Sequence, residues 1–162
     1  MKITKEWLTK KGACAEGVAW LLGQEERDFV KVLKKLIRTG EREKLEWANW
    51  TIVRGMEYKQ YVAYGIFAAE QVLELFEKKY PEDKRPRVAI EAVKKCLSDP
   101  SEKNKAAARA AWTAGTAGAA AWTARDAAEA ARDAAGAAGA VARDAMKIKI
   151  LKHGITLLKE KK

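Results

Sequence analysis

The 162-residue chain is poor in the residues that turns, metal sites and disulfides require. It has 11 glycines and three prolines, too few for a β-sandwich with its many turns. The one histidine, His153, cannot build a histidine-rich zinc site, and no cysteine or carboxylate cluster stands at ligand spacing. Cys14 and Cys96 are far apart and form no CxxC pair, so we expect reduced thiols in a cytosolic protein.

Long apolar runs are also missing. Four lysines interrupt residues 1–11 and no apolar stretch follows, so we expect no secretory signal. The longest uncharged run, residues 110–124, is shorter than the ~20 residues that a membrane-spanning helix needs. The sequence therefore predicts a cytoplasmic protein without a membrane partner.

No catalytic motif is present. The chain contains no G-x-S-x-G, no G-x-G-x-x-G and no Walker loop. Cys14 lies near a predicted helix start, but we expect a buried, inert thiol, and we expect His153 to be structural or solvent-facing. Catalytic residues, metals and cofactors are all predicted to be absent, and an enzyme is the least favoured class.

Helical periodicity, in contrast, is present in nearly every segment. From Phe29 to Ile37 apolar residues recur at helical spacing, and Gly40 follows where a left-handed cap is expected. Further amphipathic helices are predicted after Thr4, over 45–56, over 58–80 and from Pro86. The pattern predicts an all-α fold, a single-domain multi-helix bundle over residues 1–162 with amphipathic helices in 1–98.

Residues 99–162 are predicted to form an alanine-rich helical hairpin and a basic tail. Asp99 as N-cap, with Pro100 and Glu102 behind it, is a helix-start signal. The triplet ARD then recurs at steps of seven and eleven residues, which align its charges along one helix. This favours close helix packing over a disordered or ice-binding tract. A helix over about 119–159 is expected, unless Gly136 or Gly139 breaks it.

The net charge of +10 comes from the first hundred residues and the basic tail, because the alanine-rich tract is neutral. A basic protein favours an acidic partner, which can be a protein, a nucleic acid or a membrane surface. The lysines are spread over separate predicted helices and often have acidic neighbours. A nucleic-acid partner is therefore less favoured than a protein.

Six tryptophans are many for this length. Tryptophan and arginine are typical interface anchors, although at helical spacing most tryptophans fill a core. Trp47, Trp50 and Arg54 fall three or four residues apart, so they are predicted to share a helix face and to include exposed members.

The segment RPRVAIEAVKKCL, residues 85–97, followed by the alanine-rich tract, resembles the immunity protein family of bacterial polymorphic toxin systems. The segments ACAEGVAWLL and WANWTIVR are similar to relatives of that family in gut bacteria and phage. The resemblance covers most of the chain. It implies an all-helical cytosolic protein that binds and neutralises a cognate toxin without catalysis. The family motif falls on Arg85, Pro86, Arg87, Ala89, Ile90, Glu91 and Ala92.

The net positive charge of the chain narrows the class of toxin that we expect as its partner. Inhibitors of nucleases commonly present an acidic face to a basic cleft, so this basic chain favours an acidic toxin. Arg85 and Arg87 can bind partner carboxylates bidentately, or bond Asp83, Glu91 or helix C-termini within the fold. The predicted partner-binding residues are Arg85, Arg87, Glu91, Trp47, Trp50 and Arg54. A basic nucleic-acid-binding module and a purely structural or oligomerising helical protein are the alternatives.

Overall fold

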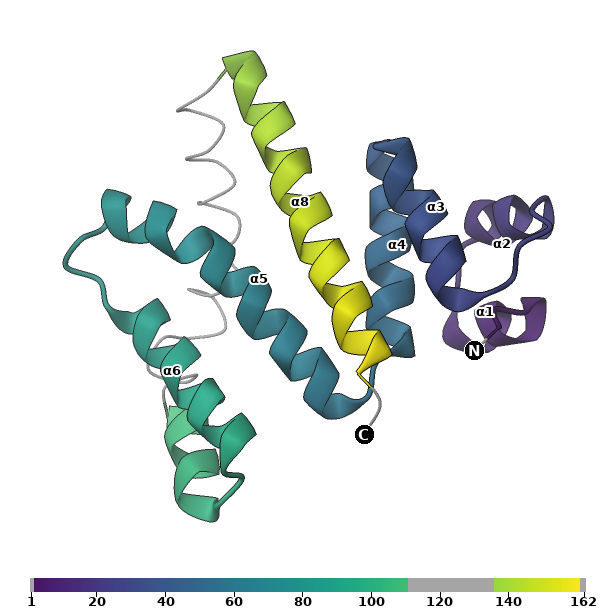
Figure 1. Ribbon diagram of the computed structural model, residues 1–162. Coiled ribbons are helices and arrows are strands. Elements are labelled where there is room, and N and C mark those ends of the chain that lie inside the picture. Colours follow the sequence, from purple (N-terminus) through teal and green to yellow (C-terminus); the bar gives the residue numbers. More distant parts are fainter. Residues whose placement is uncertain (1, 111–135, 161–162) are drawn as a thin grey trace. The chain divides into compact units, whose positions relative to one another are not determined.

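The computed structural model describes residues 2–110 and 136–160 (Figure 1). The helices are α1 (Lys5–Lys11), α2 (Ala15–Leu22), α3 (Phe29–Thr39), α4 (Arg42–Gly55), α5 (Tyr58–Lys79), α6 (Arg85–Ser98) and α8 (Gly136–Lys159). Residues 102–110 are also helical. The described ranges hold no strand, only an isolated bridge between Lys2 and Asp28. The predicted all-α fold is confirmed.

The helix ends follow the local signals in the sequence. The Thr4 hydroxyl accepts a hydrogen bond from the Trp7 N–H at 3.2 Å and starts α1. Gly12 and Gly40 end α1 and α3 in the left-handed region, at φ 74° and 70°. The Asp28 carboxylate accepts from the Lys31 N–H at 3.0 Å and starts α3. These short-range bonds fix where the helices begin and end.

One predicted start is wrong. Asp99 does not cap the alanine-rich helix; its N–H donates to the Lys95 carbonyl at 2.9 Å and completes α6. The cap is Ser101, whose carbonyl accepts from the Lys105 N–H at 2.9 Å. Helical residues begin at 102, so Pro100 stays outside the helix. The Asp99 side chain instead accepts from the Ser101 N–H and holds this turn.

The chain divides into two compact units, and each is described by itself. The N-terminal unit comprises residues 1–56 and 147–162. Its core includes Leu33 and Leu45, which are fully buried where α3 packs on α4, and Leu151 from α8, which is 1% exposed. Lys147 of α8 forms an ion pair with Glu46 of α4.

Nearly all the net charge lies in the N-terminal unit. It holds 18 of the 32 lysines and arginines but nine of the 22 acidic residues, so it carries +9 of the +10. The second unit is close to neutral.

The second unit comprises residues 57–146, and its described part contains α5 and α6 packed on each other. Tyr64, Leu73 and Phe76 of α5 are buried. Burial raises the pKa of Tyr64 to about 12. Pro86 lies in the first turn of α6, as predicted. A single domain over residues 1–162 stays a prediction.

Much of the predicted alanine-rich hairpin, including Trp112, Trp122 and two ARD triplets, lies outside the described residues. α8 runs without interruption from Gly136 to Lys159, so Gly139 does not break it, and it ends where the sequence predicted. Across 2–110 and 136–160, none of the helices combines the length and apolar character that crossing a bilayer would require.

Candidate functional site

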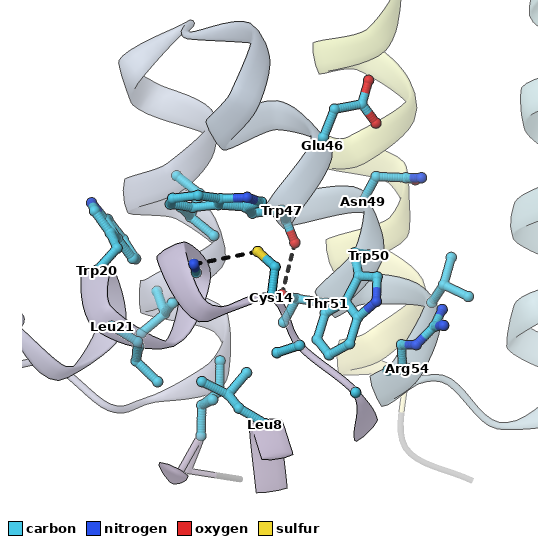
Figure 2. A pocket seen from close by; sticks show the side chains of 17 residues that line it. Leu8, Cys14, Trp20, Leu21, Glu46, Trp47, Asn49, Trp50, Thr51 and Arg54 are labelled. Carbon is cyan, nitrogen blue, oxygen red and sulfur yellow. Dashed lines mark hydrogen bonds between the residues drawn. The ribbon is translucent and has the colours of Figure 1, made fainter. Parts of the chain in front are cut away.

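A cavity of about 480 Å³ lies among α1, α2, α3 and α4 of the N-terminal unit (Figure 2). Several of its lining side chains are buried and apolar, among them Leu8, Leu21, Val32 and Leu36. Three half-buried tryptophans, Trp20, Trp47 and Trp50, also line it. Two exposed charged residues, Glu46 and Arg54, are also part of the lining. The site is therefore an apolar cavity with tryptophan walls and a charged margin.

The pattern of α4 explains why its tryptophans face the cavity. Leu45, Ala48 and Ile52 are fully buried and fix one face of the helix in the core. Trp47, Trp50 and Arg54 fall on the neighbouring face and line the cavity together, as their spacing predicted. Figure 2 shows Trp47 and Trp50 on either side of Cys14, with Arg54 beside Trp50.

Aromatic contacts hold these rings in place. The Trp7 ring packs edge-to-face on Trp50 at 6.1 Å and on Phe29 at 5.7 Å between centroids. Trp20 lies 6.2 Å from Trp47 in a tilted arrangement. Such pairs stabilise a fold beyond their burial. All four tryptophans of the described residues are half-buried, so they combine core packing with an accessible surface.

Cations flank the two α4 tryptophans. The Lys44 Nζ lies 3.9 Å from the Trp47 ring centroid, and the Arg54 guanidinium lies 4.9 Å from that of Trp50. Lys44 also pairs with Glu43 at 3.3 Å, and Glu46 pairs with Lys147. Arg54 has no carboxylate partner among the described residues. The margin of the cavity is therefore positive, and Arg54 carries its unpaired charge.

Cys14 differs from the expectation of a buried thiol. It is exposed and serves as the N-cap of α2, its Sγ accepting from the Gly17 N–H at 3.4 Å. The short α2 needs a cap acceptor at this position, and the sequence offers sulfur there. Both cysteines are free.

The arginines of the RPR segment lie in the second unit, apart from the cavity residues in the chain. Arg85 donates to Asp83 through Nε at 2.8 Å and Nη2 at 2.6 Å. Arg87 donates to Glu77 of α5 through Nε at 2.7 Å and Nη2 at 2.5 Å. Both guanidinium groups are about half exposed, at 59% and 47% of their side chains. Asp83 was one of the internal partners expected for these arginines. The pair between Arg87 and Glu77 was not predicted.

These pairs set the charge state of the carboxylates. Hydrogen bonding from Arg87 lowers the pKa of Glu77, and hydrogen bonding from Arg85 lowers the pKa of Asp83. Lowered folded-state pKa values favour folding above the unfolded pKa, and this contribution disappears as the pH falls through the folded pKa.

Replacing Arg87 with alanine is expected to raise the pKa of Glu77 towards its ordinary range, because the largest cause of its lowering is removed. Carboxyl carbon chemical shifts followed through an acid titration by NMR measure this. The matched control is Arg85→Ala, which should raise the pKa of Asp83 and leave that of Glu77 in place. If the pKa of Glu77 is the same in Arg87→Ala as in the wild type, the ion pair between Arg87 and Glu77 is contradicted.

The structure brings Trp47, Trp50 and Arg54 together in one unit, and Arg85, Arg87 and Glu91 on α6 in the other. Trp20 was missed as a cavity residue, since it comes from another helix and no local spacing links it to Trp47. Within the described ranges, no group of three or more His, Cys, Asp or Glu side chains is arranged to hold a metal ion.

Comparison with known proteins gives one match. The family model described as "Imm-5 like putative immunity protein" matches residues 53–156, more than half of the chain. No curated protein and no solved structure matches. The matched residues include the whole second unit with α5 and α6. Of the cavity residues, only Val53 and Arg54 fall within the match.

Proposed function

The chain belongs to the Imm-5 like immunity protein family, and on that premise we propose that it is a cytoplasmic, non-catalytic protein that binds and neutralises a cognate bacterial toxin. The observation that carries the proposal is the family match over residues 53–156. The RPR segment that carried the resemblance lies within it. Neutralisation requires a surface that holds the toxin, so the exposed charged residues of the matched part are the first place to test.

The α6 surface offers such a set in Arg85, Arg87 and Glu91, which are all exposed. The two arginines use Nε and Nη2 for Asp83 and Glu77, so these pairs leave Nη1 of each guanidinium for a partner. The internal pairs also hold the planar groups in a fixed orientation, which lowers the entropy lost on binding. A carboxylate or carbonyl on an acidic toxin surface suits these donors.

Co-expression with the toxin domains encoded beside its gene tests the proposal. We expect the wild-type chain to restore growth and to co-purify with one of them. Arg85→Glu should weaken that complex about tenfold or more, because an unfavourable charge replaces a donor. Lys59→Glu is the matched control, since Lys59 is also exposed, lies in the same unit and makes the same charge change.

Failure of every neighbouring toxin to be neutralised or co-purified would refute the proposal. The +9 charge of the N-terminal unit favours a second candidate, a nucleic-acid-binding module. Retention of nucleic acid by the purified protein, lost steeply as salt is raised, would support that candidate instead.

A further inference from the structure

The tryptophan-lined cavity is not explained by the family match. Apart from Val53 and Arg54, its lining residues precede residue 53, where the match begins. Toxin neutralisation by the matched part would not need Trp20, Trp47 or Cys14. Yet the N-terminal unit leaves three tryptophans half-buried around an open apolar space.

We propose that this cavity is a separate protein-docking site, which takes one large apolar side chain of a partner segment that carries carboxylates beside it. The volume of about 480 Å³ lies within the ~300–1,000 Å³ of ordinary ligand sites. Accessible tryptophan walls are typical of the pockets into which interface anchors insert.

The chemistry of the lining favours a side chain over a small polar ligand. Small-molecule sites rely on a few polar groups that converge inside the cavity. Here the Thr51 hydroxyl is already donated to the Trp47 carbonyl at 2.7 Å, and Thr51 is 5% exposed. The other buried lining residues are all aliphatic, so the buried part of the lining favours an apolar group.

The charges at the margin of the cavity indicate which charge the partner carries beside its inserted side chain. Glu46 is neutralised by Lys147, while Arg54 stands exposed over Trp50 without a carboxylate partner among the described residues. A cationic segment would meet repulsion from Arg54 and would find the two α4 ring faces approached by Lys44 and Arg54. A carboxylate next to the inserted side chain can instead accept two hydrogen bonds from the Arg54 guanidinium, in a bidentate pair.

The arrangement of rings and charges at the cavity also disfavours a long polyanion as its occupant. The Trp7, Trp20, Trp47 and Trp50 rings contact their aromatic neighbours edge-to-face or tilted, so they do not form a row of parallel ring faces on which successive nucleic-acid bases stack. Arg54 is a single unpaired cation at the margin of the cavity, whereas a nucleic-acid backbone is bound along a groove of many cations. The occupant is therefore a short acidic and apolar protein segment.

Three capped peptides test this, titrated into the full-length protein at low ionic strength: Gly-Glu-Phe-Glu-Gly, Gly-Lys-Phe-Lys-Gly and Gly-Glu-Ala-Glu-Gly. None contains tryptophan, so a change in tryptophan fluorescence comes from the protein, in which three of the six tryptophans line the cavity. We expect saturable binding of the first peptide, and at least about tenfold weaker binding of the other two. Equal affinity for the acidic and basic peptides, or no binding of the Glu-Phe-Glu peptide, would overturn the proposal.

Arg54→Glu provides the decisive variant, because Arg54 is exposed and its replacement spares the core. It should reverse the preference between the acidic and basic peptides. Arg38→Glu, an exposed position on α3 of the same unit with the same charge change, should keep the wild-type preference. Equal loss in both variants would assign the effect to net charge and refute a local site.

A second copy of this chain as the occupant would appear as dimerisation that Arg54→Glu abolishes in analytical ultracentrifugation, and it would also overturn the proposal. The peptide titration needs no toxin, so its failure is separate from a failure of toxin neutralisation.

Discussion

Replacing Gly55 with alanine is expected to destabilise the protein by about 1–3 kcal/mol, the usual cost of inserting atoms into a packed core. A Cβ at Gly55, the last residue of α4, would lie 2.3 Å from Cζ of Phe29. The Phe29 ring cannot easily move, because it is 3% exposed and packs edge-to-face on Trp7. Urea unfolding followed by circular dichroism measures the change in the free energy of unfolding.

Gly65→Ala is the matched control for this substitution. Gly65 lies within α5, and a Cβ there would meet nothing within 4 Å. Alanine is a better helix former than glycine, so this variant should gain about 0.5–1 kcal/mol. Opposite signs at the two helical glycines would establish that the contact with Phe29, and not helix propensity, decides the result. A neutral Gly55→Ala would contradict the packing described.

Replacing Leu151 with alanine is expected to cost about 2–5 kcal/mol, the range for a leucine deleted from a core. Leu151 is 1% exposed and comes from the part of α8 that belongs to the N-terminal unit. The loss should therefore appear in residues 1–56, far away in the sequence. Hydrogen exchange of the α3 and α4 amides, together with urea unfolding, detects it.

Lys152→Ala, the next position of α8, is exposed and serves as the control. It should change the free energy of unfolding by less than about 0.5 kcal/mol, as exposed positions generally do. Faster exchange confined to α8 in Leu151→Ala, with α3 and α4 still protected, would show that α8 does not complete this core.

Local signals were enough to predict most of the helices. Thr4, Gly40 and Pro86 act through bonds and dihedral angles within one turn, and each falls where its residue type predicted. The role of Asp99 was predicted wrongly because the residue lies between two helices. Its N–H bonds to the Lys95 carbonyl at the end of α6, so it is the C-cap of that helix and not the N-cap of the next one. A cap signal between two adjacent helices does not say which helix it serves.

The candidate site was predictable only where it lies on one helix. Trp47, Trp50 and Arg54 share a face of α4 and could be grouped by spacing. Trp20 reaches the same cavity from α2, and Arg87 meets Glu77 across the α5–α6 turn; both depend on how the helices pack. Cys14 was expected to be buried because thiols usually are, but its position as a helix cap keeps it at the surface.

The division of the N-terminal unit between residues 1–56 and 147–162 has a consequence for synthesis on the ribosome. The helices with the tryptophans are made first, but the α8 segment that shares their core is made last. At ~5–20 residues per second, the intervening residues 57–146 delay it by roughly 5–20 seconds. During that interval the core of the N-terminal unit lacks Leu151, and its apolar residues are open to chaperones or aggregation. The second unit is continuous in the chain, so it can fold first, and the part of the protein that is translated earliest is the last to be completed.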